Sequence, residues 1–494
     1  MFFNRASRWD RPYNSDSPFT AHRSLFTLHF PHFLALKWLG LIISQVIERG
    51  FMPHAFLTNI KERFNALLSS PTRRRLASGA FWGGVAAAGA RFVTVITSFF
   101  LARILGQIGF GEYGMITSTA IMVGSFAGMG IGLTVTKHVA EFKSKDPDRV
   151  GRLLALSSIV TMASALIYGV AFVALAPWLA ERTLAAPHLA PMLRISAISV
   201  AFSVVNGVQV SSLAGVEAFR AKSHIMVGTG LLQTVLVVIG AWLWGLEGAV
   251  WAMAVGMLLT VIVTRWVVSR EWHRRNIRLL WREARREWRI LLDFSLPAFL
   301  NSLLIGPVYW ACNAFLANEP NGYAELGIFN AAAQWQGAIL FLPWLFITAM
   351  IPVISEKYGD GDVTGSLKVM ADMMKLIVWA VVPIAAVLSL SSPWVMSGYG
   401  DTFTAGYWTM VLLVATGVFN GIEAPIQHFA VASGQVWARL ALYGLWAAVL
   451  LAASWFMVKW GAEGLAGARL FSAVFHFVLF YLFIVTHQKK VTSC

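Results

Sequence analysis

The chain has 494 residues, of which 57% are hydrophobic and only 13% are charged, and its mean hydropathy is +0.65. This composition excludes an ordinary soluble domain, in which about a quarter of the residues are charged. The net charge of +15 does not require nucleic acid as a partner, because membrane proteins concentrate Lys and Arg in cytoplasmic loops. The longest polar interval between apolar runs, from about 269 to 293, is too short for a soluble catalytic domain.

Residues 1–70 precede the first long apolar run and are expected to form a cytoplasmic extension that is disordered or lies at the membrane interface. Their apolar run, Phe33 to Ile47, is shorter than a membrane span and contains Lys37. The histidines of this region have no spacing that indicates a metal site, and we predict no metal and no cofactor for the chain.

Twelve later runs are long enough to cross a membrane as helices. They cover about 76–102, 114–136, 153–176, 190–213, 224–244, 248–268, 295–317, 327–353, 370–391, 408–430, 439–458 and 466–486. With the N-terminus in the cytoplasm, nearly all loop Lys and Arg residues fall on the cytoplasmic side, and only Arg103, Arg182 and Lys459 fall on the other. This asymmetry predicts a multi-pass membrane protein with both termini in the cytoplasm.

The sequence repeats itself weakly at a period of about 215 residues. The segment 109–114 (GFGEYG) recurs as 322–327 (GYAELG), and the segments 205–207 and 245–248 recur as 419–421 and 461–464. We therefore predict an all-α protein of two six-helix lobes around a central cavity, with an N-lobe at 71–268 and a C-lobe at 294–494. Since six is even, both lobes enter the membrane from the same side, and an axis along the membrane normal should relate them.

The segment between the lobes, 269–293, is predicted to be a basic amphipathic helix on the cytoplasmic surface. Ile277, Trp281, Ala284 and Trp288 recur at a spacing of three or four residues, with arginines on another stripe. Two interpretations are open: a linker anchored on anionic lipids, or a surface that recruits an anionic substrate or a cytoplasmic partner.

The loop after the first span reads LARILGQIGFGEYG at 101–114 and is followed by MGIGL at 129–133, TKHVAE at 136–141 and KDPDR at 145–149. These stretches resemble the oligosaccharide flippases, the Wzx-like polysaccharide-transport family of the multidrug/oligosaccharidyl-lipid/polysaccharide (MOP) exporter superfamily. Gln107 and Ile108 depart from the usual Pro-Glu of that loop. The resemblance covers about 76–486 and implies export of a lipid-linked oligosaccharide by alternating access, with a polysaccharide polymerase and glycosyltransferases as partners beside membrane lipids.

A diphosphate head group needs a polar, preferably cationic path, so the candidate site residues are polar side chains inside the apolar spans. Arg91, near the middle of the first span, is the strongest candidate, and a packing role against helix carbonyls or a carboxylate is the alternative. Glu423 is expected to neutralise a cation, to carry a coupling proton or to have a structural role, and its repeat counterpart is Gln209. Arg469 either faces the cavity or reaches back to the outer surface. Asn301, Asn313, Asn330, Gln334 and Gln336 could bind sugar hydroxyls or join helices.

No nucleotide-binding P-loop, nucleophile elbow or Cys-x-x-Cys pair occurs in the chain. A membrane glycosyltransferase or polymerase would need catalytic groups on a large outer loop, whereas the longest outer loop, about 392 to 407, is short. We therefore predict a transporter and not an enzyme. The alternative is a cation-coupled multidrug exporter of the same superfamily, which would be expected to place acidic side chains in its cavity.

Overall fold

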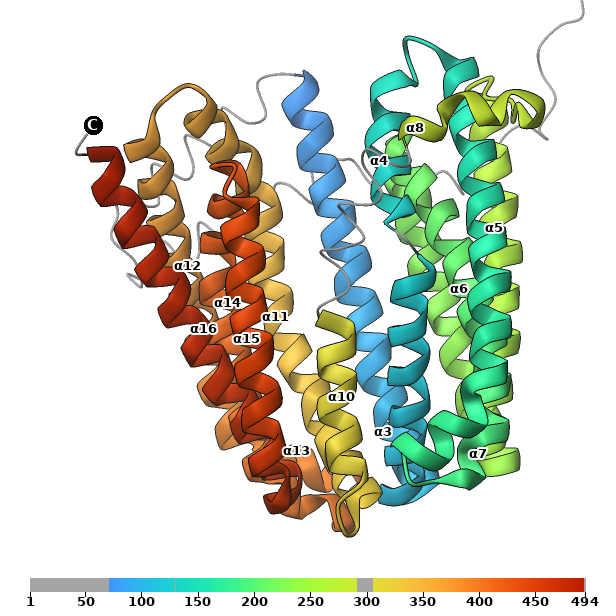
Figure 1. Cartoon of the computed structure of the whole chain (residues 1–494), viewed down its shortest axis with the longest axis vertical. Coiled ribbons are helices and arrows are strands. Elements are labelled where there is room, and N and C mark those ends of the chain that lie inside the picture. Colours follow the sequence, from blue (N-terminus) through green and yellow to red (C-terminus); the bar gives the residue numbers. More distant parts are fainter. Residues whose placement is uncertain (1–70, 129, 291–304, 493–494) are drawn as a thin grey trace, which may run out of the picture. The chain divides into compact units, whose positions relative to one another are not determined.

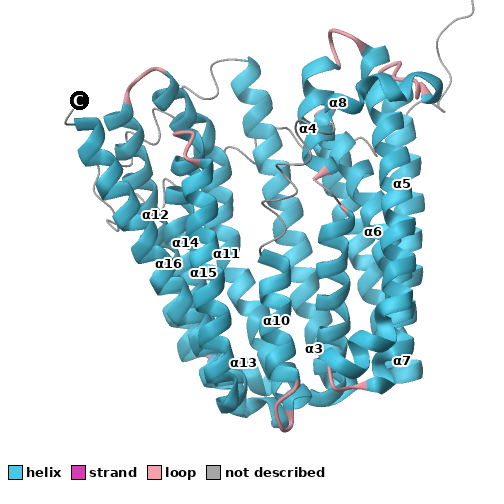
Figure 2. Cartoon of the chain, viewed as in Figure 1, coloured by secondary structure: helices cyan, strands magenta, loops and turns pink. Residues whose placement is uncertain are grey.

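The computed structural model describes residues 71–128, 130–290 and 305–492. These residues form helices joined by short loops, and no strand occurs among them (Figures 1 and 2). Seven of the described helices are long and apolar enough to cross a membrane. Three of the seven each extend over two of the expected spans: Ala87–Ala127, Phe219–Arg274 and Trp437–Thr486. The all-α, polytopic fold class is confirmed, and the residues 1–70 lie outside the described part.

Five long helices form the N-lobe, and short π and 3-10 turns join α5 to α6. They are α3 Pro71–Ala127, α4 Ile131–Phe142, α5 Pro147–Trp178, α6 Ala190–Gly215 and α7 Phe219–Arg274. In the C-lobe, α11, α12, α14 and α16 pack on one another, and α10 and α15 complete the group (Figure 1). Its helices are α10 Ile305–Ala317, α11 Gly322–Gly359, α12 Val363–Leu390, α13 Ser392–Tyr399, α14 Tyr407–Ala432, α15 Val436–Met457 and α16 Gly461–Thr492.

The helices bury small polar side chains and expose large apolar ones, the reverse of a soluble protein. On α5, Thr161 and Ser164 are almost fully buried, whereas Met162 and Leu166 are more than 60% exposed. Ser164 donates its hydroxyl proton to the carbonyl of Ala127 on α3, so the polar groups join helices. Apolar side chains on the outside are favourable only in contact with lipid, which identifies the bundle as membrane-embedded.

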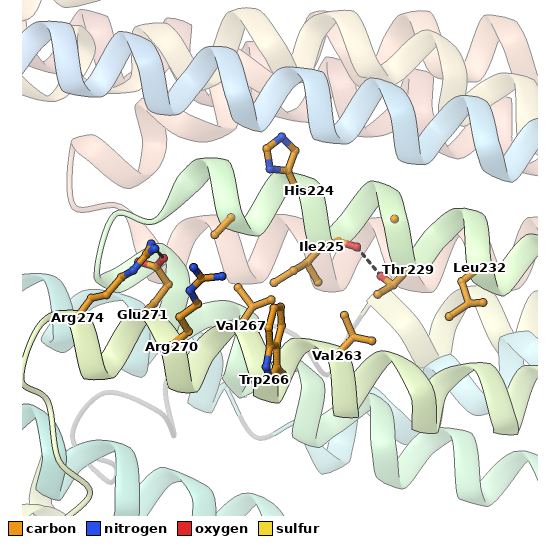
Figure 3. Close-up of a pocket in the computed structure, with 12 residues that line it drawn as sticks. His224, Ile225, Thr229, Leu232, Val263, Trp266, Val267, Arg270, Glu271 and Arg274 are labelled. Carbon is orange, nitrogen blue, oxygen red and sulfur yellow. Dashed lines mark hydrogen bonds and ion pairs between the residues drawn. The ribbon is translucent and has the colours of Figure 1, made fainter. Parts of the chain in front are cut away.

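Two helices are continuous in sequence but turn back in space. The 56 residues of α7 would extend about 84 Å at 1.5 Å per residue, far beyond a hydrocarbon core of ~30 Å. Non-helical angles at Trp244 and Gly245 divide α7 into two antiparallel limbs, and Gly106 divides α3 in the same way. Next to the turn of α7, a Cβ on Gly240 would overlap the carbonyl of Gly248, so these glycines permit the tight approach. Figure 3 shows the two limbs farther along, where they carry separate rows of side chains.

The two copies of the repeated loop contact each other. A Cβ on Gly111 would overlap the carbonyl of Tyr323, and a Cβ on Gly327 would overlap the carbonyl of Gln107. Equivalent segments meet in this way when a two-fold axis passes between them, as parallel repeats require. We call this end of the bundle, which contains the Gly106 break, the loop end, and the end that contains the α4–α5 loop the basic end.

Hydrogen bonds join the lobes at the loop end. Each runs from a side chain of one lobe to a main-chain carbonyl of the other: Arg103 Nε to Gly398 (2.8 Å), Asn318 Nδ2 to Thr183 (2.8 Å) and the Tyr323 hydroxyl to Leu184 (2.8 Å). The lobes are therefore held together at this end of the membrane.

The segment between the lobes differs from the single amphipathic helix that the sequence suggests. Helix α7 ends at Arg274, the chain then runs without helix to Leu280, and a 3-10 helix covers Trp281–Glu287 before the short α8, Trp288–Ile290. The Leu280 amide donates to the Gly151 carbonyl of α5, and a Cβ on Gly151 would overlap the Arg278 carbonyl. The segment is thus bound to the N-lobe by its main chain.

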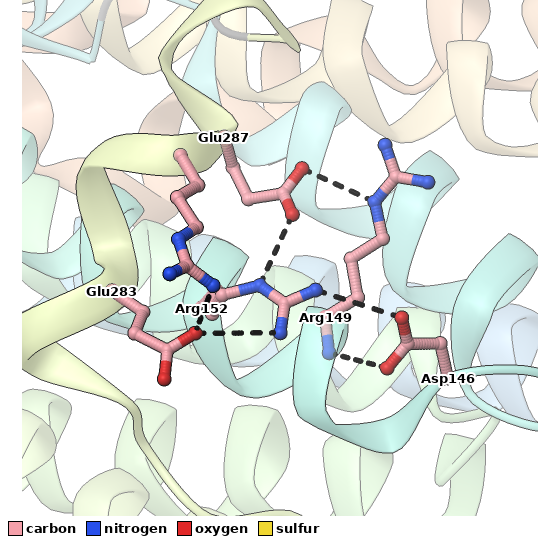
Figure 4. A network of polar contacts seen from close by, with 6 residues as sticks. Asp146, Arg149, Arg152, Glu283 and Glu287 are labelled. Atoms are coloured by element: carbon pink, nitrogen blue, oxygen red, sulfur yellow. Dashed lines mark hydrogen bonds and ion pairs between the residues drawn. The ribbon is translucent and has the colours of Figure 1, made fainter.

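Ion pairs reinforce this attachment (Figure 4). The carboxylate of Glu287, 7% exposed, accepts from Arg149 Nε at 3.1 Å and from Arg152 Nε at 3.3 Å. Asp146 caps α5 by accepting from the Arg149 amide and also pairs with Arg152. A spacing of three or four residues between apolar side chains therefore did not distinguish a surface α-helix from this docked segment. The docking depends on the Glu287 carboxylate, whose partners Arg149 and Arg152 lie 138 and 135 positions away in the sequence.

Candidate functional site

Arg91 lies at a contact between the two lobes. It is on α3, 15 residues before the break at Gly106, or about 22 Å along the helix. Its Nη2 donates to the main-chain carbonyl of Gln334 on α11 of the C-lobe. A Cβ on Gly337, one turn farther along α11, would overlap the guanidinium, so the absence of a side chain there makes room for Arg91. Its Nε is buried and has no partner in the described part of the chain.

The contact with a helix carbonyl agrees with the packing role considered for Arg91, but it leaves the guanidinium incompletely satisfied. An arginine has five N–H donors, and one carbonyl accepts from one of them. Within the described residues, no carboxylate forms an ion pair with Arg91. The arrangement therefore keeps a cation and free donors inside the bundle.

Arg469 points into the C-lobe and does not reach back to the surface. Its Nη2 donates to Asn313 Oδ1 at 3.2 Å, and its guanidinium lies 4.6 Å from the ring centre of Tyr309 and 4.4 Å from that of Phe329. Cation–π contacts of this kind stabilise a desolvated arginine. Asn313, for which sugar binding and hydrogen bonding between helices were both open, accepts in the structure from this arginine of another helix.

Glu423 is paired with a histidine that the sequence analysis did not single out. Its Oε1 lies 2.8 Å from His476 Nδ1, and both side chains are at least 95% buried between α14 and α16. Gln427 donates to the same oxygen at 2.8 Å, and the Tyr443 hydroxyl contacts Gln427 Oε1 at 2.6 Å. Glu423 Oε2 and His476 Nε2 have no partner among the described residues. Glu423 thus belongs to a polar cluster within the C-lobe and does not neutralise Arg91.

The remaining predicted amides are dispersed. Asn330 faces α3, since a Cβ on Gly114 would overlap its side chain, and its Nδ2 has no partner in the described part of the chain. Gln336 is buried on α11, and Gln209 lies on α6 with a buried, unpartnered Oε1 among the described residues. Asn301 lies outside the described residues.

The structure therefore brings Arg91, Gln334 and Asn330 to the α3–α11 contact, and Arg469 and Asn313 to the C-lobe core. Sequence reasoning missed Gly337 and His476. An ionisable residue in the middle of the apolar α16 was the available signal for His476, because such residues are rare inside membranes. Among the described residues, no three His, Cys, Asp or Glu side chains gather as metal ligands.

Comparisons with known proteins agree with this geometry. The family described as "Polysaccharide biosynthesis protein" matches residues 76–357, more than half of the chain. The EPS I polysaccharide export inner membrane protein EpsE of Ralstonia nicotianae is 22% identical over 390 residues, which cover 76% of this chain and 85% of that protein. EpsE of Ralstonia solanacearum is 21% identical over 411 residues, which cover 79% of this chain and 89% of that protein.

Solved structures of MOP superfamily transporters have the same fold. The inward-facing conformation of a multidrug resistance MATE family transporter has a TM-score of 0.64 at 17% identity and covers 81% of this chain and 96% of its own. A MOP superfamily transporter from Pyrococcus furiosus, described as having a binding pocket of reverse polarity, is similar as well. It has a TM-score of 0.59 at 16% identity, and the match covers 85% of this chain and 97% of that transporter. The helical architecture and the matched family lead to one conclusion: the chain belongs to the polysaccharide biosynthesis protein family, and its fold is the one seen in solved MOP superfamily transporters.

Proposed function

We propose that this protein moves a lipid-linked oligosaccharide, carried on an isoprenoid diphosphate, from the cytoplasmic to the outer leaflet of a bacterial inner membrane. The product would serve surface polysaccharide biosynthesis, such as exopolysaccharide or O-antigen, and the EpsE relatives, named as polysaccharide export inner membrane proteins, support this assignment. The distribution of Lys and Arg supports cytoplasmic termini, which would make the loop end the outer end.

The observation that carries the proposal is the incompletely satisfied cation at Arg91. Burial of a cation without a counter-charge is costly in a membrane, and a diphosphate supplies both the charge and several acceptor oxygens. Because Arg91 is on the N-lobe and its present acceptor is a carbonyl of the C-lobe, a diphosphate that takes over the guanidinium removes one contact between the lobes. Binding of the head group is thereby coupled to separation of the lobes, as alternating access requires.

Two amides of α11 suit the sugar part of this substrate. The Asn330 Nδ2 has no partner among the described residues, and this side chain faces Gly114 on the limb of α3 that does not carry Arg91. Gln334, whose carbonyl accepts from Arg91, is one turn farther along α11. Amide side chains can both donate to and accept from sugar hydroxyls. Arg469 and Gln209 are assigned lesser roles, since Arg469 is held by Asn313 and two rings, and Gln209 lies on α6 in the N-lobe.

The alternative is a cation-coupled multidrug exporter, which Glu423 and the MATE transporters of known structure favour. A cationic drug requires an accessible carboxylate. Glu423 is completely buried and is held by His476 and Gln427, whereas Arg91 and Arg469 are cations inside the bundle that form no ion pair with a carboxylate among the described residues. The electrostatics therefore favour an anionic substrate.

Replacement of Arg91 tests the proposal. In a strain that depends on this protein for surface polysaccharide, Arg91→Ala should abolish polymer output, and Arg91→Lys should retain part of it because the charge is kept. Arg282→Ala, which removes an exposed arginine from the segment between the lobes, is the matched control and should have no effect. All variants are compared at equal amounts in the membrane.

Three outcomes would contradict the assignment. Normal polymer output from Arg91→Ala would remove Arg91 from the site. Unchanged polysaccharide together with increased drug sensitivity in a strain lacking the protein would establish the multidrug function instead. Accumulation of lipid-linked oligosaccharide on the outer face of spheroplasts without the protein would show that another protein moves it.

A further inference from the structure

A groove of about 430 Å³ lies between the two limbs of α7, toward the basic end (Figure 3). Its walls are two rows of side chains at helical spacing, which face each other across the antiparallel limbs. Ile225, Gly228 and Leu232 lie on the first limb, and Val263, Trp266 and Val267 lie on the second. Thr229 also lines this level, with its hydroxyl bonded to the Ile225 carbonyl at 2.7 Å, and the other side chains here are apolar.

The groove is a wedge that opens toward the basic end. Near the turn of α7 the limbs touch through Gly240 and Gly248, and farther along Gln233 closes the space by donating to the Met253 carbonyl at 3.4 Å. Beyond this point the limbs separate. Nothing lies within 4 Å of a Cβ built on Gly228, so the space is open at the centre of the first wall.

The wide end of the wedge is charged. Arg270, Glu271 and Arg274 line it from the second limb. Glu271 is shared between Arg274, at 3.1 Å, and Arg275, so with Arg270 this part of the helix has three arginines and one carboxylate. The ring centre of Trp266 lies 5.9 Å from the Arg270 guanidinium. The mouth of the groove therefore has a net positive charge.

The groove opens to hydrocarbon and not to water. The exposed side chains beside it are Leu231 and Val235 on the first limb and Ile262 and Trp266 on the second, and each is more than half exposed. Such a surface is stable only against lipid, and a tryptophan beside arginines is typical of the membrane interface. An occupant must then reach the groove from the bilayer, with an apolar tail along the walls and a negative group at the mouth.

We propose that this groove binds one anionic phospholipid of the surrounding membrane, with an acyl chain between the limbs of α7 and the phosphate at Arg270 and Arg274. A narrow wedge suits one unbranched chain, and basic pockets between membrane helices at this depth bind anionic head groups. This site lies within the N-lobe, on a helix pair that does not contain Arg91, and its occupancy is independent of the proposed transport.

Native mass spectrometry of the purified full chain tests the site, with phosphatidylglycerol and phosphatidylcholine of identical chains as probes. The wild type should bind phosphatidylglycerol more tightly. The double variant Arg270→Gln/Arg274→Gln should weaken phosphatidylglycerol binding by on the order of tenfold and abolish the preference between the two lipids. Gly228→Leu, which fills the groove, should weaken the binding of both lipids.

The matched control removes the same charge elsewhere. Arg278→Gln/Arg282→Gln changes two exposed arginines outside the groove and should leave phosphatidylglycerol binding unchanged. An equal loss in this control would overturn the proposal, since it would show attraction by net charge alone. Tighter binding of an isoprenoid phosphate than of phosphatidylglycerol, abolished by Gly228→Leu, would also overturn it and assign the groove to a substrate tail.

Discussion

Removal of the Glu287 carboxylate should release the segment between the lobes from the N-lobe. In Glu287→Ala, both Arg149 and Arg152 lose their acceptor. A charge-assisted hydrogen bond contributes about 1.5–3 kcal/mol when it is buried, and this range applies to Arg152, whose side chain is 17% exposed. Arg149 is 38% exposed, so solvent screening reduces its contribution to about 0.5 kcal/mol. The local opening free energy should fall by about 2–3.5 kcal/mol.

Hydrogen exchange measured by mass spectrometry reports this opening directly. In peptides that cover Trp281–Glu287, exchange should accelerate roughly 30- to 400-fold, while peptides from the centre of α5 keep their protection. Glu283→Ala is the control, because the Glu283 carboxylate is 44% exposed, contacts Arg286 on the surface and lies 3.9 Å from Arg152. It should accelerate exchange less than about fivefold. Equal acceleration in the two variants, or none in Glu287→Ala, would refute the assignment of the attachment to Glu287.

Two further predictions concern single helices. Gly248→Val should lower the melting temperature and broaden the gel-filtration peak in detergent, because the new side chain would overlap the Gly240 carbonyl beside the turn of α7. The control is Gly359→Val, which should have a much smaller effect, because nothing lies within 4 Å of a Cβ at that position. At the start of α12, the hydrogen bond from Lys357 and then the Gly365 amide lower the pKa of Asp362. The cap should therefore protect the first amides of α12 from exchange above pH ~4 and lose this protection as the pH falls through the lowered pKa; Asp362→Asn should remove the pH dependence, and an unchanged profile would contradict it.

The fold was largely accessible from the sequence because lipid imposes a simple rule on length and polarity. Spans, breaks and the duplication follow from apolar runs and repeated glycines, and Gly111 and Gly327 even lie at the contact between the repeated loops. The conformation of a segment that is held by one residue far away in the sequence could not be predicted. The segment after Arg274 has helical spacing, yet its conformation depends on a carboxylate at Glu287 that meets α5.

In the candidate site, too, the charged residues could be predicted from the sequence, whereas their partners could not. Arg91 could be singled out because a charge inside an apolar span is rare. Its acceptor could not, because the Gln334 carbonyl is a main-chain group that every residue possesses. Glu423 was recognised as a buried carboxylate, but its partner His476 lies on another helix, and only packing brings the two together.

Three of the hydrogen bonds that join the lobes at the loop end depend on a side chain from one lobe only. Arg103, Asn318 and Tyr323 each supply a donor, while their acceptors are peptide carbonyls, which no side-chain substitution removes. Substitution of one residue, the donor, is therefore enough to weaken, strengthen or remove each hydrogen bond. The exposed carbonyls that accept from Arg103 and Asn318 can also exchange their protein donor for water at little net cost. The contacts of Arg103 and Asn318 therefore suit the separation of the lobes that we propose, since neither the donor nor the acceptor is left without a partner when they break.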